Sequence, residues 1–424
     1  MPLKPRLDVM PRVICVAKDR YPPFRVDIVE LMSRRLGAAG LCCDWIMQRD
    51  QPGRSEIIEH SASERFLVLD RGFGIVSGAM LLARAVMAIL RGDYQIVQVR
   101  DLPLTAVLFL LLARLARRPF VYWMSFPMVE SPGHRARNPD ERIPAWRRVV
   151  MRLYSAVGGF FYYRVVMRGA DQIIVQSDRM KADLVRRGIK PGKIVPVPMG
   201  VSTEIYHPAA VAPADDPNSS GAAVLVYVGT CLPVRRIDIM VRALADLVRR
   251  GRDAMLVIVG DVRPEDATRL RAVAAEEHVA DRLVFTGRLP LVQALGYVRR
   301  ATVCLAPCPK DPILLPGTPT KLVEYLAMGR PVVANDHPDQ MHVLHASGAG
   351  LVAPLSPRGF ADAIDQLLAD PAAAEAMGER GPAWVAANRS YDVLSTRVFA
   401  AYTSLLRGWD RRYGKTAQAS DRRP

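Results

Sequence analysis

Short, nearly uninterrupted apolar runs alternate with helix-length segments in the first half of the chain, and this alternation restricts the fold most. Such runs are typical of strands buried on both faces, as in a parallel sheet covered by helices. An amphipathic helix is predicted at residues 27–36, ending at Gly37. The predicted strands are residues 12–17, 66–69, 95–99, 120–123, 172–175 and 193–197. The first half is therefore predicted to be a doubly wound α/β domain.

The same alternation restarts after a segment without periodicity. Residues 208–221 are rich in proline, alanine and small polar residues, which is typical of a linker. Beyond it, strands are predicted at residues 224–228, 255–259, 283–286, 303–306, 331–334 and 350–352, and helices at residues 238–249, 264–277, 291–299, 319–328 and 357–368. Since 424 residues exceed what one core supports, we predict two such domains, residues 1–207 and 222–390, with a ligand between them.

The composition limits the partners. The net charge of +16 favours anionic membrane surface or phosphorylated substrates, whereas no basic run interleaved with aromatics indicates a nucleic-acid groove. The apolar run at 13–17 is too short for a signal peptide, and the run at 102–113 is too short to span a membrane. The six cysteines show no metal-site spacing, so reduced thiols of a cytoplasmic protein are expected.

Residues 317–335 predict a loop, a helix of about three turns, a glycine stop and a buried strand. Thr318 is the expected N-cap and Pro319 the expected first helical residue. The backbone N–H groups of Thr320 and its successors would then point out of the helix start beside Lys321, a favourable place for phosphate. Lys321 and Glu324 share a helix face. A cation for a diphosphate and a carboxylate for sugar hydroxyls therefore lie side by side.

Two apolar segments are open to a membrane interpretation. Residues 104–116 favour a buried helix of the first domain. Residues 145–168 mix Trp146, Phe160, Phe161, Tyr162 and Tyr163 with arginines, which is typical of a helix lying on anionic lipid. The alternative, a core-packing helix with a solvated arginine face, is slightly favoured over the lipid interpretation.

An ordered set of motifs over residues 10–406 resembles the retaining glycosyltransferases of family 4. The motifs are Tyr227-Val228-Gly229 with Arg235 and Asp238, Leu256 to Asp261, Val284 to Arg288, the 317–335 stretch, Ala170 to Ser177, and Met199 to Ser202. The resemblance implies the GT-B fold, two Rossmann-like domains facing across a cleft. It also implies a C-terminal helix at 391–412 that packs back towards the first domain. Residues 413–424 are predicted to be a disordered tail.

The resemblance also implies the roles of particular residues. Arg235, which stands where the family usually has lysine, and Lys321 would bind the donor diphosphate, although Arg236 could serve instead of Arg235. Glu324 would accept hydrogen bonds from the ribose, and these three residues would carry catalysis. The remaining donor-binding residues implied are Gly229, Gly260, Gly287, Gly317, Thr318, Pro319 and Thr320.

Some positions depart from the family pattern. Pro316 stands where a glutamate is often found, Thr230 where an arginine is common, and Ser125 where a histidine usually ends a strand. Residues 18–23, predicted as a loop, replace a glycine-rich turn. His134 follows the Ser125 strand, and we expect it to be a surface residue rather than an acceptor contact.

The chain contains no Asp-x-Asp, so we expect no metal and no other cofactor. Lys321 and Arg235 would stabilise the leaving diphosphate, which itself could take the acceptor proton. The leading interpretation is a nucleotide-sugar-dependent glycosyltransferase (EC 2.4) acting on a sugar or lipid-linked acceptor in polysaccharide or glycolipid assembly, in the cytoplasm or at the inner face of the membrane. The alternatives are a silent nucleotide-sugar-binding subunit, and an inverting transferase or sugar epimerase. Neither the sugar, the base nor the acceptor follows from the residues.

Overall fold

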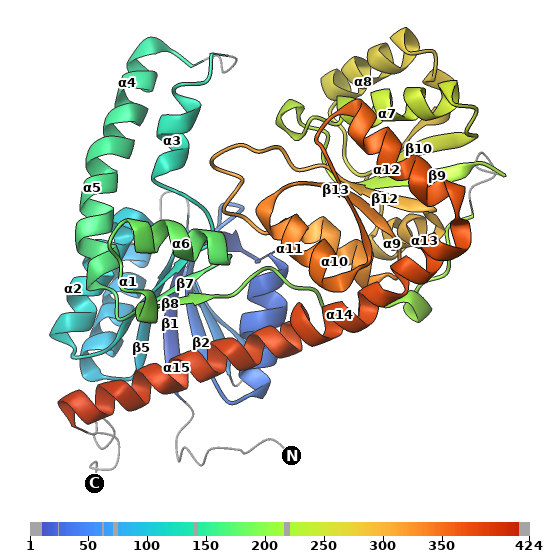
Figure 1. The fold of residues 1–424 in the computed structure, drawn as a ribbon. Helices are drawn as coiled ribbons and strands as arrows, with labels where there is room; N and C mark the ends of the chain where they lie inside the picture. Colours follow the sequence, from blue (N-terminus) through green and yellow to red (C-terminus); the bar gives the residue numbers. More distant parts are fainter. Residues whose placement is uncertain are drawn as a thin grey trace. The chain divides into compact units, whose positions relative to one another are not determined.

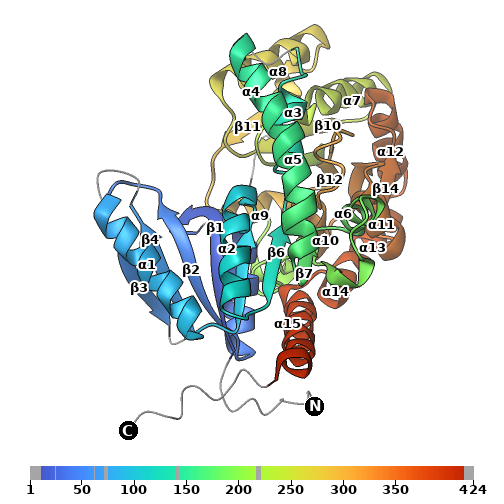
Figure 2. The same ribbon diagram turned by 90° about the vertical axis from the view of Figure 1, so that its left-hand side faces the viewer.

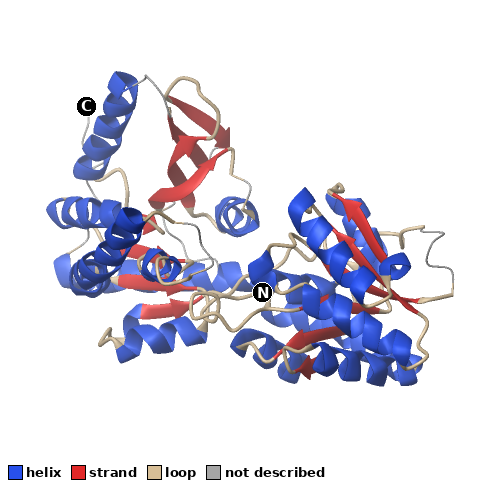
Figure 3. Ribbon diagram, turned by 90° about the horizontal axis from the view of Figure 1, so that it is seen from above, coloured by secondary structure: helices blue, strands red, loops and turns tan. Residues whose placement is uncertain are grey.

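The computed structural model describes residues 11–23, 25–61, 63–70, 75–139, 143–215 and 221–414, without the side chains of residues 75–78. The chain divides into two compact units (Figure 1). Unit 1 comprises residues 1–198 and 394–424, and unit 2 comprises residues 199–393. Within each unit, helices flank a sheet (Figure 3). The mixed α/β architecture with two predominantly parallel sheets confirms the predicted fold class.

The sheet of unit 1 has the strand order β3-β4-β2-β1-β5-β6-β7-β8. Neighbouring strands are parallel except at the edge, where β3 runs antiparallel to β4. The strands are β1 (Arg12–Tyr21), β2 (Cys42–Arg49), β3 (Glu56–Ser61), β4 (Glu64–Leu69), β5 (Ile96–Arg100), β6 (Phe120–Met124), β7 (Gln172–Val175) and β8 (Ile194–Pro196). The order places the carboxyl ends of β1, β5 and β6 next to one another.

Two of these strands were not predicted, and a third is longer than predicted. β2 contains Asp44, which is fully buried because Arg12, Arg65 and Tyr94 donate hydrogen bonds to its carboxylate. A charged residue in the middle of a strand hides the apolar pattern, and its partners are distant in the sequence. β3 is a largely exposed edge strand. β1 continues through Tyr21, so residues 18–21 are not the predicted loop.

The helices of unit 1 form its outer layer. They are η1 (Asp27–Leu36), α1 (Ile75–Arg91), α2 (Pro103–Leu115), α3 (Glu130–Arg135), α6 (Asp178–Arg186) and α15 (Tyr391–Tyr413), together with one continuous helix made of α4 (Ala145–Leu153), η2 (Tyr154–Gly158), α5 (Gly159–Phe161) and η3 (Tyr162–Met167). The prediction of a buried helix at 104–116 is only half correct. Ala106, Phe109, Leu110 and Ala113 of α2 are buried, but the leucines of its other face are exposed. No helix in the described residues is long and apolar enough to cross a membrane.

The sheet of unit 2 is wholly parallel, in the order β11-β10-β9-β12-β13-β14. Its strands are β9 (Ala223–Val228), β10 (Ala254–Val259), β11 (Leu283–Gly287), β12 (Val303–Ala306), β13 (Val332–Asn335) and β14 (Gly350–Ala353). Its helices are α7 (Asp238–Arg249), α8 (Pro264–Glu276), α9 (Leu291–Arg300), α10 (Thr320–Ala327), α11 (Pro338–Ser347), α12 (Pro357–Ala369), α13 (Pro371–Gly378) and α14 (Arg380–Asn388).

The apolar runs of unit 2 are continuous because both faces of its sheet are covered. Leu225 and Tyr227 of β9 lie in one buried cluster, whereas Val224 and Val226 lie in another. Successive side chains of a strand point to opposite faces. A strand between two helical layers therefore needs apolar residues at every position, as the sequence analysis assumed.

The division between the units falls after Pro198 instead of in the predicted linker at 208–221. Residues 208–215 pack on unit 2: Val211 is buried in its core, and the Ala214 backbone N–H donates to the carbonyl of Gly296 at 2.9 Å. Residues 216–220 lie outside the described residues. Most of α15 belongs to unit 1, where Tyr402 donates a hydrogen bond to Gln98. Of the predicted tail, residues 415–424 lie outside the described part.

Candidate functional site

Two glycines lie at the carboxyl-terminal edge of the unit 2 sheet, directly after β9 and β10. Gly229 and Gly260 have φ angles of 136° and 141°, which L side chains rarely adopt. A Cβ atom on Gly260 would lie 2.8 Å from the carbonyl oxygen of Gly229. A Cβ atom on Gly229 would lie 2.6 Å from Cε of Lys321. Both positions therefore require glycine, and the first keeps open the space that Lys321 occupies.

Helix α10 begins at this edge without a side-chain cap. It starts at Thr320 with Pro319 in the cap position, so the prediction that Thr318 is the cap is wrong by one residue. The buried Thr318 instead accepts, through Oγ1, a hydrogen bond from the backbone N–H of Met199 at 3.0 Å. With no described side chain capping α10, the N–H groups of its first turn are available to an anion.

Lys321 is held in the first turn of α10 against an aromatic ring. Its Nζ lies 5.4 Å from the centre of the Tyr227 ring, a cation–π contact. Burial, together with the positive charge of Arg235, lowers the pKa of Lys321 to about 8. Within the described residues its ammonium forms no ion pair. The carboxylate of Glu324 opposes this shift of the Lys321 pKa only in part. A buried cation without a direct ion pair is costly, so the position favours an anionic ligand.

Arg235 lies close enough to Lys321 for their charges to interact, and it too forms no ion pair with any described residue. It ends the short helix η7 (Pro233–Arg235), and its charge also acts on Tyr227. Its neighbour Arg236 is exposed and is paired with Asp238 at 3.3 Å. The structure therefore favours Arg235 over Arg236 as the second cation of the site.

Glu324 lies one turn beyond Lys321 on the same helix. Its pKa is raised by burial, an effect opposed by the Lys321 ammonium and by hydrogen bonds with Tyr206 and Thr320. A carboxylate in this setting can accept further hydrogen bonds from hydroxyl groups. The structure thus brings Arg235, Lys321, Glu324 and Gly229 together around the start of α10.

The other predicted donor residues lie around this group. Gly260 donates its N–H to the carbonyl of Gly287 at 3.0 Å, which joins the ends of β10 and β11. Gly317 donates its N–H to the carbonyl of Leu314 at 2.9 Å, in the turn that leads into α10. The predicted residues therefore occupy loops at one edge of one sheet.

Asn335 is a supporting residue that sequence reasoning missed. It is fully buried at the end of β13, and its side chain makes two hydrogen bonds to the backbone of Cys308. Oδ1 accepts from the Cys308 N–H at 2.6 Å, and Nδ2 donates to the Cys308 carbonyl at 2.8 Å. The only signal was a polar residue directly after the predicted strand at 331–334. This clamp fixes the loop after β12, where the positive charges of Lys321 and Arg235 act on the Cys308 thiol.

His337 and Gln340 support the same region from the β13–α11 connection and were also missed. His337 is fully buried; its Nε2 lies 3.2 Å from the carbonyl of Leu314, and burial lowers its pKa. Gln340 donates to the carbonyl of Ala306 at 2.8 Å. Nothing in the sequence indicated that these two residues are buried and bind backbone carbonyls instead of lying at the surface.

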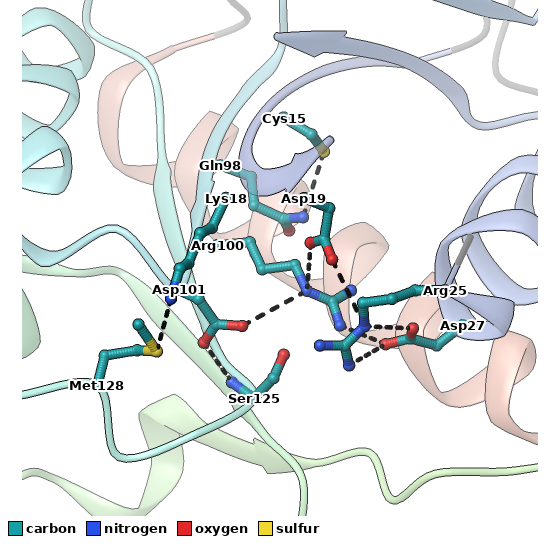
Figure 4. Close-up of polar contacts among 10 residues, drawn as sticks. All are labelled: Cys15, Lys18, Asp19, Arg25, Asp27, Gln98, Arg100, Asp101, Ser125 and Met128. Carbon is teal, nitrogen blue, oxygen red and sulfur yellow. Dashed lines mark hydrogen bonds and ion pairs between the residues drawn. The ribbon is translucent and has the colours of Figure 1, made fainter. Parts of the chain in front are cut away.

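In unit 1, three carboxylates surround a buried arginine near the carboxyl ends of β1 and β5 (Figure 4). Arg100 donates to Asp27, and its Nε lies 3.9 Å from Asp19 and 3.8 Å from Asp101. Arg25 also pairs with Asp27, at 3.0 Å. The Arg100 and Arg25 cations lower the pKa of Asp27 to about 2 against the opposing effect of burial. The sequence signal was an Arg-Asp pair directly after a predicted strand, and it was not used.

Ser125 lies beside this cluster, at the end of β6 (Figure 4). Its backbone N–H donates to Asp101 at 2.8 Å, and burial raises the pKa of Asp101. Its hydroxyl is buried and has no hydrogen-bond partner among the described residues. His134 lies on α3 and is partly buried. Within the described residues, no group of three or more His, Cys, Asp or Glu side chains could hold a metal ion.

The fold places the chain in a structural class. Sucrose-phosphate synthase from Thermosynechococcus elongatus shares 20% identity and a TM-score of 0.66 over 94% of this chain and all of that one. WaaG, a glycosyltransferase involved in lipopolysaccharide biosynthesis, has a TM-score of 0.60 at 16% identity over 92% of this chain and 99% of that chain. Since both identities are low, the likeness shows the fold: two Rossmann-like domains of the GT-B type.

The sequence families identify the group more closely. Residues 6–200 match the family described as "Glycosyl transferase 4-like domain", and residues 222–370 match "Glycosyl transferases group 1". The two matches together account for most of the chain, which belongs to the family 4 glycosyltransferases.

Curated relatives agree with this assignment. The D-inositol 3-phosphate glycosyltransferase of Nocardia farcinica is 29% identical over 56% of this chain and 55% of its own length. A GDP-mannose-dependent phosphatidylinositol monomannoside mannosyltransferase of Mycobacterium tuberculosis is 30% identical over 50% of this chain and 56% of its own. The core mannosyltransferase LpcC of Rhizobium leguminosarum is 28% identical over 58% of this chain and 68% of its own. The chain thus matches about half the length of the first two.

Proposed function

We propose that this protein transfers a sugar from a nucleotide-diphosphate sugar to an acceptor. The observation that carries the proposal is the pair of cations at the start of α10. Lys321 and Arg235 stand close together without ion pairs to described residues, next to uncapped helix N–H groups. Two unpaired cations and a helix N-terminus match the charge and the geometry of a diphosphate.

Each residue of the site has a role in this proposal. Lys321, Arg235 and the first N–H groups of α10 bind the diphosphate and stabilise the charge that grows on it as the sugar departs. Glu324 accepts hydrogen bonds from the ribose hydroxyls. Gly229 leaves room for Lys321, and Gly260 and Gly287 shape the adjoining loops.

We propose that the reaction needs neither a metal nor another cofactor, because the cations supply the charge that a metal would otherwise provide. The absence of Asp-x-Asp from the chain supports this. We further propose retention of configuration: the acceptor attacks from the face that the nucleotide leaves, and the departing phosphate takes the acceptor proton. The anomeric configuration of the product tests retention, because an inverted product would exclude it.

For the acceptor we propose a phosphorylated or lipid-linked sugar in polysaccharide or glycolipid assembly. The names of relatives support this class, since they include an inositol-phosphate glycosyltransferase and a phosphatidylinositol-mannoside mannosyltransferase. A cytoplasmic protein peripheral to the inner face of the membrane would meet such acceptors. Release of UDP or GDP in the presence of phosphorylated and lipid-linked sugars tests the acceptor class.

The donor site is tested by thermal unfolding with UDP, GDP and ADP. At a ligand concentration one hundredfold above Kd, the matching nucleotide should raise the midpoint by about 5–10 °C. Lys321→Ala should abolish this shift. Lys310→Ala is the matched control. Lys310 lies in the connection between β12 and α10, but it is exposed and is paired with Asp336. A full shift in Lys321→Ala would remove the diphosphate assignment.

A second candidate is a catalytically silent nucleotide-sugar-binding subunit. Pro316 and Ser125, which replace a glutamate and a histidine common in the family, favour it. A silent subunit would show the nucleotide shift but would neither hydrolyse nor transfer any donor. An inverting transferase or a sugar epimerase would instead be recognised by its product.

A further inference from the structure

Helix α2 carries a row of exposed leucines. Leu104, Leu108, Leu111 and Leu115 are 68%, 63%, 60% and 72% exposed. Their spacing of four, three and four residues places them on one side of the helix. The opposite side, with Phe109 and Leu110, is buried in the core of unit 1. Scattered exposed leucines are common, but a complete row on one helix is not.

The continuous helix at 145–167 carries a second apolar row. Trp146, Val150, Leu153, Val157 and Phe160 are between 48% and 67% exposed and follow the same three- and four-residue spacing. At 1.5 Å per residue the helix is about 35 Å long. The slight preference for a core-packing helix in the sequence analysis is therefore wrong for this side of the segment.

These helices adjoin within unit 1. α2 packs against η3 at the end of the long helix and against α1. Figure 2 shows α1, α2 and α5 beside one another on the side that faces the viewer. α1 adds exposed Met80, Met87 and Leu90. We call the exposed residues of α1, α2 and the 145–167 helix the apolar face.

The helices of the apolar face carry only basic charged residues, although neighbouring segments add two carboxylates: Asp171 pairs with Arg114 at 2.8 Å, and Glu130 accepts a hydrogen bond from Tyr163. Residues 75–91, 103–118 and 145–168 contain no aspartate or glutamate, but they contain ten arginines. Arg147 lies 5.7 Å from the centre of the Trp146 ring, and Arg164 lies 5.3 Å from that of Phe160. Arginines beside exposed apolar residues can lay their stems along an apolar surface while the guanidinium groups stay at a polar, anionic boundary.

This charge pattern distinguishes between two partners that could cover the apolar face, a second copy of the chain and an anionic bilayer. In a symmetric dimer the same patch would meet itself, so arginines would face arginines without carboxylates from these helices. An anionic bilayer provides hydrocarbon for the leucine rows and phosphate for the arginines. We propose that the apolar face of unit 1 inserts into the interfacial region of an anionic bilayer. Only the link to a lipid-linked acceptor rests on the proposed function; membrane binding itself does not.

Flotation with phosphatidylcholine vesicles, with and without phosphatidylglycerol, tests the proposal. Wild-type protein should float only with the anionic vesicles. Replacing Leu104, Leu108, Leu111 and Leu115 by glutamine should abolish flotation without lowering the unfolding midpoint, because these side chains are exposed. The control is Leu291→Gln with Val292→Gln, which changes exposed apolar residues of unit 2 and should float normally.

The arginines and Trp146 provide separate readouts. Arg147→Gln with Arg164→Gln should weaken binding to anionic vesicles about thirtyfold, from about fivefold per lost charge. The emission of Trp146, which is 67% exposed, should shift to the blue with anionic vesicles, and Trp146→Phe should remove the shift.

Three outcomes would overturn the proposal: no flotation of the wild type, normal flotation of the leucine variant, or equal binding to neutral vesicles. A concentration-dependent dimer that the leucine variant abolishes, without vesicle binding, would assign the face to a second copy of the chain. The nucleotide-induced thermal shift separates the two proposals. Flotation without that shift would reject only the donor site, whereas the shift without flotation would reject only membrane insertion.

Discussion

Lys321 is the residue whose setting has the clearest consequence. Its side chain is held between the Tyr227 ring and the backbone of Gly229, and burial together with Arg235 lowers its pKa. The ammonium is therefore partly deprotonated at mildly alkaline pH in the free protein. A bound diphosphate would restore the charge, so binding and protonation of this one group are linked.

Nucleotide affinity should therefore depend on pH above neutrality. The pKa of Lys321 is about 8 in the free protein, and a diphosphate beside it raises that pKa. As pH rises through about 8, binding must take up a proton, and UDP affinity should fall by up to about tenfold per pH unit. Phosphate ionisation, with a pKa of about 6, is already complete there. The Cys231 and Cys308 thiols, with pKa values of about 11, do not titrate in this window.

Calorimetric titration in buffers of different ionisation enthalpy measures the proton uptake. Lys321→Met is the control and should bind weakly with little pH dependence. Equal wild-type affinity at neutral pH and well above pH 8 would contradict the prediction.

Gly229→Ala should damage the site through sterics. The new methyl group would collide with Cε of Lys321 and would sit at a φ of 136°, which costs on the order of 1–3 kcal/mol. We expect a lower free energy of unfolding and loss of the UDP-induced shift. Gly251→Ala is the matched control, since Gly251 has a φ of 82° with open space around it. It should lose stability but keep the nucleotide response.

Arg100→Met tests the buried ion cluster of unit 1. Removing the cation leaves the buried Asp101 without an ion pair among the described residues and leaves Arg25 alone to offset Asp27 and Asp19, which should lower the free energy of unfolding by about 3–5 kcal/mol. Arg20→Met breaks an exposed pair with Asp50 and should cost about 1 kcal/mol or less. Urea denaturation of both variants measures the difference. Equal effects would mean that the cluster contributes no more than a surface pair.

At the scale of elements, the sequence predicted what depends on local pattern and missed what depends on distant partners. The strands of unit 2 and its helices α7, α8, α9, α10 and α12 follow from apolar periodicity, and the start of α10 was predicted within one residue. Helices α11, α13 and α14 were not predicted. The true cap differs because Thr318 bonds to Met199, far away in the sequence. β2 was missed because Asp44 needs Arg12 and Tyr94 to be buried. The exposure of the α2 leucines could not be predicted, because α2 is apolar on both sides and its composition does not show which side packs against the rest of unit 1.

The stability of the loop that follows β12 should depend on Asn335, whose side chain binds the backbone of Cys308. Asn335→Ala leaves the buried N–H and carbonyl of Cys308 without partners, which should cost about 1–3 kcal/mol. Because the same loop adjoins Lys321, UDP binding should weaken as well. Asn388→Ala is the control: its single bond to the carbonyl of Trp384 lies within one helix. Thermal unfolding with and without UDP measures both effects, and an unchanged UDP response would separate the clamp from the donor site.

At the scale of the molecule, the predicted two-domain division holds, but its boundaries do not follow composition. The proline-rich segment at 208–215 packs on unit 2, and residues 394–413 belong to unit 1. Composition indicates where a chain is irregular, and packing decides which unit it joins. Unit 2 is one contiguous stretch, residues 199–393, that contains Arg235, Lys321 and Glu324.

A fragment of residues 199–393 should therefore fold alone and retain a nucleotide-induced thermal shift. By contrast, a chain ending at residue 393 should lose the packing of Tyr402 and Trp409 against unit 1. We expect that truncated chain to show a normal transition for unit 2 and a weakened or missing one for unit 1. Differential scanning calorimetry resolves the two transitions, and a single lost transition for both units would contradict the division.

The discontinuity of unit 1 also sets an order of events during synthesis. The strands of unit 1 leave the ribosome first, yet α15, which covers Gln98 and Arg117, is made only after residues 199–393. At about 5–20 residues per second, this delay is on the order of 10–40 s. Unit 2 can thus finish folding on the ribosome before α15, the last helix of unit 1, has been synthesised. During that interval the nascent chain would expose apolar surface that a chaperone could bind.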